Sequence, residues 1–145
     1  MKIILASKSG VRKKILDTNQ VDCEVCPSNV DEDEVKISLI SSGANPLLIS
    51  KNLAELKANK VSLKNPDRIV LGADSVIDFN GKLISKPKNR EEALNILIQL
   101  NGKEHKLISS VCISKNGSMI WNFTDTSSLM MKKLSLNEIK KYLSN

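Results

Sequence analysis

The apolar and polar positions of this chain repeat with two periods, one typical of strands and the other typical of helices. Alternate apolar positions predict strands, and apolar positions three or four residues apart predict helices. The predicted strands cover residues 2–5, 22–26, 68–73, the runs on both sides of Asn80–Gly81, the runs on both sides of Asn116–Gly117, and 127–132. The predicted helices cover residues 9–19, the stretch after Asn45, the stretch after Asn89, and the end of the chain. Strands and helices that alternate in this way predict an α/β domain.

Turn and capping residues place the ends of several predicted elements. Asn-Gly pairs adopt the positive φ angles of a type I′ turn, so Asn80–Gly81 predicts a hairpin. Asn45 is a predicted N-cap, with Pro46 at the first helical position, where the missing N–H of proline costs nothing. Residues 27–44 contain the acidic run Asp-Glu-Asp-Glu and then Ser-Ser-Gly, and we expect a loop or lid there.

The size and composition predict one soluble globular domain over residues 1–145. Of the 145 residues, 41% are hydrophobic and 26% are charged, which are ordinary proportions for such a domain. No apolar run in the sequence approaches the ~18 residues of a membrane span, so we expect no membrane partner. The three cysteines are an odd number, which fits a reducing cytoplasm better than a disulfide framework. We therefore expect a cytoplasmic protein.

The net charge of +6 makes anionic partners worth considering. Readout of base edges relies on arginine, yet only three of the 22 basic residues are arginines. Binding of single strands relies on aromatic stacking, yet aromatic residues make up only 3% of the chain. We therefore expect no specific nucleic acid partner. General lysine richness and attraction of small phosphorylated ligands both remain explanations of the charge.

The first informative stretch joins the strand at residues 2–5 to the helix at 9–19. Ser7, Ser9 and Arg12 lie at this junction. The free N–H groups at a helix start favour anions, and a guanidinium can bind two phosphate oxygens at once. The junction therefore predicts a phosphate-binding corner. A plainly capped helix with a solvated basic turn is the alternative that this stretch alone leaves open.

The second informative stretch runs from the strand at 68–73 to Pro87. Asp74 follows the apolar residues of that strand, and Lys86 precedes the proline at the end of the predicted hairpin. The carboxyl ends of strands in open α/β sheets are common ligand sites. A carboxylate and a lysine joined by a hairpin would hold a metal ion and a phosphate side by side. An ordinary turn at Asp74 and a solvated strand end at Lys86 explain the pattern equally well.

Together these stretches resemble the Maf family, which comprises nucleoside triphosphate pyrophosphatases. Seven segments occur in the family's order: LASKSGVRKKIL, VDEDE, LAELKANKV, LGADSV, GKLISKP, EEALNILIQLNGKEHKL and LSLNEIKKYL. The resemblance covers nearly the whole chain. It implies an α/β fold with a mixed, mostly antiparallel twisted sheet, flanked by helices, and two lobes around a cleft. It also implies hydrolysis of a nucleoside triphosphate to the monophosphate and pyrophosphate, in a house-cleaning role toward non-standard or modified nucleotides.

The resemblance also implies roles for particular residues. The phosphate-binding positions of the family match Ser7, Ser9, Arg12, Lys13, Lys57 and Lys86. The proton acceptor matches Asp74, and the metal-side carboxylates match Glu32 and Asp74, which would hold Mg²⁺ or Mn²⁺. This sequence departs from the family at Gly10, where the family has proline, and at Lys13, where it has a second arginine. The residue after Asp74 is a serine, where family branches carry threonine or glutamine.

Two further expectations concern the end of the chain and a rival function. The family continues beyond the final helix into a glycine-rich segment, so the resemblance implies a C-terminally short domain. Such a domain either exposes a sheet edge and an apolar patch or covers them with a second copy, as in a homodimer. The rival function is a non-catalytic nucleotide- or RNA-binding module with an incomplete cleft. Turnover of triphosphates would separate the two functions, whereas the preferred base cannot be read from the residues.

Overall fold

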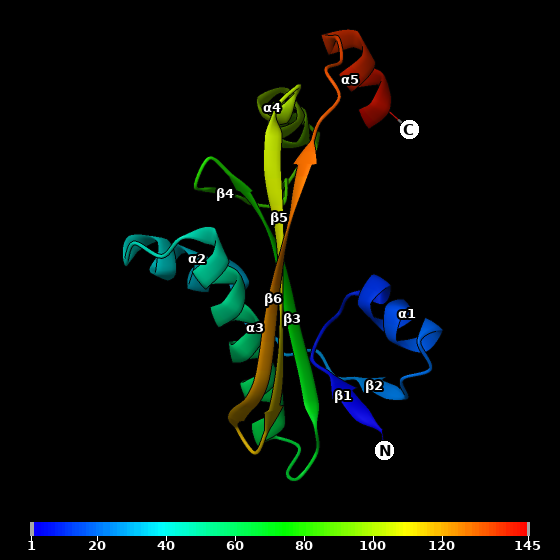
Figure 1. Ribbon diagram of the computed structural model, residues 1–145, viewed down its shortest axis with the longest axis vertical. Coiled ribbons are helices and arrows are strands. Elements are labelled where there is room, and N and C mark those ends of the chain that lie inside the picture. Colours follow the sequence, from blue (N-terminus) through cyan, green and yellow to red (C-terminus); the bar gives the residue numbers. More distant parts are fainter. Residues whose placement is uncertain (1, 145) are drawn as a thin grey trace.

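The computed structural model describes residues 2–144 and contains one mixed sheet with helices on both sides (Figure 1). The sheet has six strands, and its main order is β2-β1-β3-β5-β6, with β4 paired to β3. The strands are β1 (Ile3–Leu5), β2 (Cys23–Val25), β3 (Val70–Phe79), β4 (Lys82–Ile84), β5 (Glu104–Lys115) and β6 (Ser118–Met130). The helices are α1 (Gly10–Thr18), α2 (Glu32–Ser41), α3 (Pro46–Leu63), α4 (Arg90–Leu100) and α5 (Leu136–Leu143).

The sheet confirms the expected mixed and mostly antiparallel architecture. Strand β1 runs parallel to both β2 and β3, whereas β3, β4, β5 and β6 pair antiparallel. Strands β3, β5 and β6 are long and form a twisted ribbon along the long axis of the molecule, with α5 beyond one end of it (Figure 1). Strand β1 pairs with β3 only as far as Leu71, and β4 pairs with β3 on that side from Ile77 onward, so the stretch of β3 between them has no neighbouring strand there.

Helix α3 packs on the centre of the sheet and supplies much of the core. Asn45 caps it by accepting a hydrogen bond from the N–H of Leu48, and Pro46 occupies its first turn, as predicted. The helix lies so close to β3 that a Cβ at Gly72 would collide with the carbonyl oxygen of Ala54. This close approach brings the middle of α3 against the residues that follow Gly72 in the strand.

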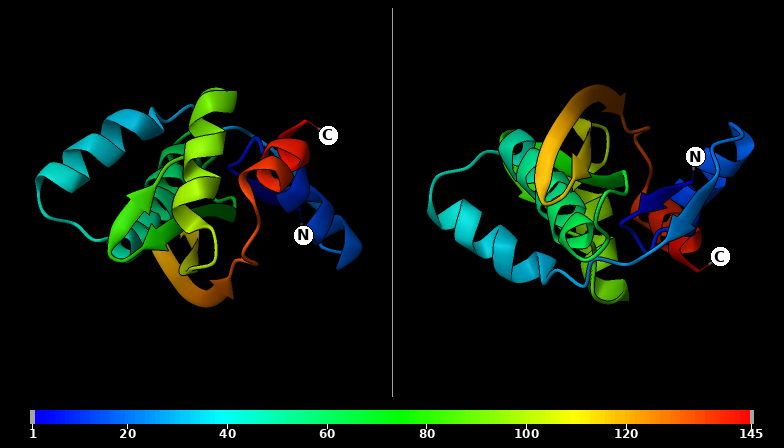
Figure 2. Two further views of the ribbon diagram at one scale, coloured as in Figure 1. Left: turned by 90° about the horizontal axis from the view of Figure 1, so that it is seen from above. Right: turned by 90° about the horizontal axis from the view of Figure 1, so that it is seen from below.

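The other helices divide between the two sides of the long strands (Figure 2). Helix α2 lies on the same side as α3, and α1 and α5 lie on the opposite side. Helix α5 packs near α4 and buries Ile139, and Asn101 after α4 exchanges two hydrogen bonds with the backbone of Leu134. The final helix therefore has a partner within residues 2–144. No helix in this range is long and apolar enough to cross a membrane.

Three local predictions were wrong. The loop or lid expected at residues 27–44 contains helix α2, because Asp31 caps it and the acids of its first turn favour the positive end of the helix dipole. Asp74 does not follow a strand but lies inside β3, which continues to Phe79. The separate strand expected at 127–132 is the second half of β6, which runs unbroken opposite β5.

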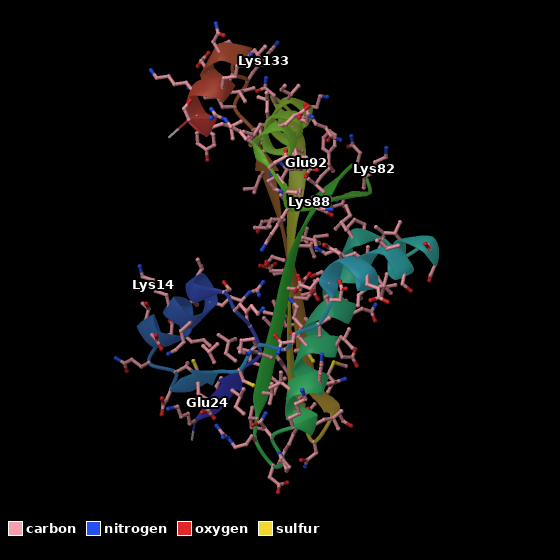
Figure 3. All side chains as sticks on the ribbon, turned by 180° about the vertical axis from the view of Figure 1, so that it is seen from behind. Lys14, Glu24, Lys82, Lys88, Glu92 and Lys133 are labelled. Carbon is pink, nitrogen blue, oxygen red and sulfur yellow. The ribbon has the colours of Figure 1, made fainter. Side chains whose placement is uncertain are left out.

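Strand β6 forms one edge of the sheet and is exposed along nearly its whole length. Trp121 and Phe123 lie on the same face, because alternate residues of a strand point to the same side, and their rings stack with centroids 6.3 Å apart. Lys14 on α1, Lys82 on β4 and Lys133 between β6 and α5 lie on three separate parts of the molecule (Figure 3).

Candidate active site

The junction between β1 and α1 forms the predicted polar corner. The Ser9 side chain caps α1 by accepting a hydrogen bond from the N–H of Arg12, at 3.3 Å. The Ser7 hydroxyl oxygen accepts two hydrogen bonds, from the N–H of Ser9 at 3.1 Å and from Arg12 Nη1 at 3.0 Å. Ser7 therefore holds the guanidinium over the start of the helix. Its own O–H proton is not used in these bonds.

A buried lysine joins two carboxylates beside this corner. Lys57 comes from α3, and its side chain is only 6% exposed. Its Nζ donates to Asp74 Oδ1 and to the carbonyl oxygen of Ala73, both at 3.2 Å, and forms an ion pair with Glu32 Oε1. Three acceptors match the three N–H donors of an ammonium group. Because Gly72 lets α3 approach β3 closely, Lys57 reaches the strand without leaving the core.

The environments of the two carboxylates shift their pKa values in opposite directions. Burial raises the pKa of Asp74 above its ordinary value, and the charge and hydrogen bond of Lys57 offset only part of this effect. Burial also acts to raise the pKa of Glu32, but the hydrogen bond and charge of Lys57 outweigh it, and the pKa of Glu32 is lowered. Lys36 and Lys86 add to the lowering at Glu32.

One oxygen of Asp74 has no partner. Asp74 Oδ2 is buried and makes no hydrogen bond in the structure, whereas Oδ1 accepts from Lys57. A buried carboxylate oxygen without a donor is costly, so its place in a native fold calls for a functional reason. The backbone around it is well supported, because the Ser50 hydroxyl lies 3.2 Å from the Asp74 carbonyl oxygen and 2.8 Å from Ser110 Oγ.

Two adjoining hollows bring these groups together. The first has a volume of about 560 Å³ and the second about 340 Å³, and both are lined by Arg12, Glu32, Lys57 and Lys86. Ser7 and Ser9 line the first hollow, and Asp74 lines the second. Five parts of the fold therefore meet at one cleft. They are the β1–α1 corner, the start of α2, the middle of α3, the middle of β3 and the end of the β3–β4 hairpin.

One predicted site residue lies apart from the cleft. Lys13 lines neither hollow, and its ammonium pairs with Asp17 one turn along α1. That hydrogen bond raises the pKa of Lys13 despite a small opposing effect of desolvation. Its predicted contact with phosphate stays a prediction.

Sequence reasoning missed several polar residues that line the hollows, among them Lys8, Ser28, Asn29 and Asp33 in the first hollow and Lys36 in the second. Lys36 lies one helical turn after Glu32, a spacing that would have been informative had residues 32–41 been predicted as a helix.

The two carboxylates fit a divalent cation of the magnesium type. Mg²⁺ binds oxygen ligands, keeps several waters and is held by one or two carboxylates together with substrate phosphates. Glu32 and Asp74 supply such carboxylates at one cleft, and the unpartnered Oδ2 of Asp74 is a ready ligand atom. Residues 2–144 contain no group of three or more His, Cys, Asp or Glu side chains placed to hold a metal without help. The donor set therefore fits an ion that arrives with phosphates.

Comparison with solved structures identifies the fold. The structure of the Staphylococcus aureus Ham1 protein matches with a TM-score of 0.51 and 16% identity, over 90% of this chain and 71% of that one. A nucleoside-triphosphatase, dITP/XTP pyrophosphatase, from Mycobacterium abscessus matches with a TM-score of 0.51 and 13% identity, over 88% of this chain and 72% of that one. At these identities the likeness shows a shared α/β fold.

The curated sequences that match this chain are more similar to it than these solved structures are. A nucleoside triphosphate pyrophosphatase of Pelagibacter ubique is 65% identical over 97% of this chain and 72% of its own length. A protein of the same name from a Ruegeria species is 41% identical over 97% of this chain and 71% of its own length. A 7-methyl-GTP pyrophosphatase of Brucella abortus is 32% identical over 99% of this chain and 72% of its own length. The family model described as Maf-like protein matches residues 2–145. The chain belongs to the Maf-like protein family.

Proposed function

We propose that this protein hydrolyses a nucleoside triphosphate to the nucleoside monophosphate and pyrophosphate. The names of the curated relatives support this activity. The main structural support is that Arg12, at the start of α1, and Asp74 line the same cleft. The buried Oδ2 atom of Asp74 has no hydrogen-bond partner. Cations and free amides suit the phosphates, and a carboxylate suits the activation of water.

The phosphate chain is proposed to bind at the corner and at the hairpin. The free N–H groups at the start of α1 and the Ser7 and Ser9 hydroxyls donate hydrogen bonds to phosphate oxygens. Arg12 and Lys86 face the same two hollows and offset the charge of the leaving pyrophosphate. The guanidinium of Arg12 is already oriented by Ser7, so less side-chain entropy is lost when it binds phosphate.

Asp74 is proposed to accept the proton of the water that attacks the α-phosphorus. Its raised pKa makes it a stronger base than an ordinary aspartate, and Oδ2 is free to receive the proton. Lys57 holds Oδ1 and thereby fixes the orientation of the carboxylate. Because the Ser50 hydroxyl supports the backbone of Asp74, the base lies on a rigid part of the sheet. No side chain is required to form a covalent intermediate.

Glu32 and Asp74 would hold the divalent cation, Mg²⁺ or Mn²⁺. Such an ion neutralises phosphate charge and lowers the pKa of bound water. The resemblance placed Lys57 among the phosphate-binding residues. Its three N–H donors contact Glu32, Asp74 and Ala73, so we assign Lys57 to holding the carboxylates, and direct contact with phosphate stays a prediction.

Pyrophosphate release from a panel of triphosphates tests the proposal. The panel should contain the ordinary nucleotides together with methylated and deaminated ones, each with and without Mg²⁺. We expect monophosphate and pyrophosphate in equal amounts from at least one of them. Binding of nucleotides or RNA without turnover would contradict the proposal, and a steep dependence of RNA binding on salt would favour the non-catalytic module instead.

We further propose that the protein acts as one domain in the cytoplasm. The free thiols of Cys23, Cys26 and Cys112 support a reducing location. A homodimer is also proposed, because β6 exposes Trp121 and Phe123 along an open sheet edge. Sedimentation velocity at several protein concentrations tests the dimer, and a concentration-independent monomer would contradict it.

A further inference from the structure

The ammonium of Lys57 lies between the same two carboxylates that the proposed function assigns to a divalent cation. It pairs with Glu32 Oε1 and with Asp74 Oδ1, and its side chain is 6% exposed. An ammonium and a divalent ion are both attracted to this pair, and they repel one another at short range. The arrangement raises the question of which contacts survive when the ion binds.

The contacts of Lys57 differ in how easily they can be exchanged. Asp74 and the Ala73 carbonyl belong to β3, and Lys57 belongs to α3, which packs tightly on that strand at Gly72. Glu32 is the first residue of α2, a helix of ten residues with none buried, and its side chain is 40% exposed. The contacts within the core are fixed, whereas Glu32 can move at little cost in packing.

The two carboxylate oxygens of Asp74 also differ in whether they are already bound. Oδ1 is taken by Lys57, and Oδ2 is buried without a partner. An ion, or a water bound to that ion, can therefore contact Oδ2 without removing Lys57 from Oδ1. Glu32 pairs with Lys57 through Oε1, and its position on an exposed helix lets it turn toward the ion at the expense of that contact.

We infer that Lys57 is a built-in cation that competes with the divalent ion for Glu32. Without the ion, Lys57 holds Glu32 and the start of α2 against α3. With the ion, Glu32 leaves Lys57 for the metal, and Lys57 keeps Asp74 Oδ1 and the Ala73 carbonyl. The inference rests on the proposed metal site of the pyrophosphatase and assigns Lys57 a positioning role within it.

The competition couples metal binding to substrate binding. In the free protein the charge of Lys57 opposes the ion, so the ion binds weakly. The phosphates of the substrate add negative charge beside Arg12 and Lys86, and they relieve this opposition. Since coupling between two ligands is reciprocal, the metal strengthens triphosphate binding by the same factor. Lys57 thus delays full metal binding until the substrate is present.

The test measures the affinity of the substrate-free protein for Mn²⁺ by electron paramagnetic resonance. Lys57→Met keeps an unbranched side chain of similar length and removes the charge. We expect this variant to bind Mn²⁺ at least ~10-fold more tightly than the unmodified chain, because a cation next to the site has been removed. Lys51→Met, an exposed position on the same helix, controls for net charge and should change the affinity by less than about twofold.

A second measurement uses the unmodified chain and decides the case even if Lys57→Met fails to fold. Carbon-13 labelling of lysine allows the ε-methylene signal of Lys57 to be followed during Mg²⁺ addition. We expect the signal to shift with the same midpoint as metal binding. A signal that stays in place at saturating Mg²⁺, or a Lys57→Met variant that folds and binds Mn²⁺ no more tightly, would overturn the inference alone. Absence of metal binding to both the unmodified chain and Lys57→Met, with and without a bound triphosphate, would overturn both the proposed metal site and the inference.

Discussion

Helices α2 and α3 meet at the same cleft but are held to the protein in different ways. Nine of the 18 residues of α3 are buried, whereas none of the ten residues of α2 is. Helix α3 and strand β3 carry Lys57 and Asp74, and α2 carries Glu32. The proposed base therefore stands on the rigid core, and the second carboxylate stands on a helix with few fixed contacts. A proton acceptor has to be held rigidly, whereas an adjustable metal ligand has to be able to move. In this fold the two groups lie on separate elements.

The largest expected effect is on turnover and comes from Asp74, which lies on the rigid strand β3. Asp74→Asn should lower turnover by at least ~100-fold while leaving triphosphate binding in place, because an amide cannot accept the proton of the attacking water. Steady-state kinetics and binding by calorimetry measure the two quantities. Asp78→Asn, four residues along the same strand and outside both hollows, is the matched control. Near-normal turnover of Asp74→Asn would show that the base lies elsewhere.

The contact between α3 and β3 gives the next largest effect. Gly72→Ala places a Cβ against the carbonyl oxygen of Ala54 and 2.9 Å from the Cβ of Ala58, so the helix has to move away from the strand. We expect a loss of about 1–3 kcal/mol in the free energy of unfolding, measured with urea. Gly10→Ala, where a Cβ meets nothing within 4 Å, should not be destabilised in this way. Equal losses for both variants would mean that the close approach is unimportant.

The phosphate-binding corner can be divided by single substitutions. Arg12→Ala and Lys86→Ala should each weaken inhibition by pyrophosphate about tenfold, because each removes a charged donor from the cleft. Lys64→Ala should have little effect, since Lys64 is exposed at the end of α3. Inhibition constants measure this. Similar losses in all three variants would indicate a general effect of charge instead of a defined site.

The smallest expected effect is on the free energy of unfolding, to which Glu32 and Asp74 should contribute with opposite sign. Because the pKa of Glu32 is lowered on folding, its charge stabilises the protein at neutral pH, and this contribution is lost as the pH falls through the folded pKa. Because the pKa of Asp74 is raised, its charge destabilises the fold above the folded pKa, and the penalty is relieved as the pH falls through that value.

At pH 7, Glu32→Gln should therefore lower the free energy of unfolding and Asp74→Asn should raise it, each by about 1 kcal/mol or less. Urea denaturation at neutral and acidic pH measures the difference, which should shrink in acid. Changes of the same sign in both variants at neutral pH would contradict the opposite pKa shifts.

The sequence predicted best where local chemistry decides the structure. The Asn45 cap, the proline after it and the hairpin at Asn80–Gly81 follow from backbone preferences of single residues, and all three are confirmed. Helix α2 was missed because its apolar residues do not face the core, so their spacing gave no helical face. Ile37, for example, is 68% exposed. An acidic run without a buried face resembles a solvated loop until its cap at Asp31 is recognised.

The sequence predicted which residues form the candidate site better than it predicted which of them contact one another. Residue types and order, together with the family resemblance, brought Arg12, Glu32, Asp74 and Lys86 to attention, and the structure places these side chains at one cleft. The role of Lys57 was not predictable, because its partners lie 17 and 25 positions away in sequence, and only the packing of α3 on β3 brings them together. The pairing of Lys13 with Asp17 is another contact that the motif does not reveal.

The most direct test of the central claim is hydrolysis in ¹⁸O-labelled water, followed by mass spectrometry of both products. Attack of water on the α-phosphorus places the label in the nucleoside monophosphate and leaves the pyrophosphate unlabelled. We expect this result, and we expect Asp74→Asn to lower the rate without changing the position of the label. Label in the pyrophosphate, or release of inorganic phosphate with a nucleoside diphosphate, would contradict attack at the α-phosphorus and with it the proposed function of the cleft.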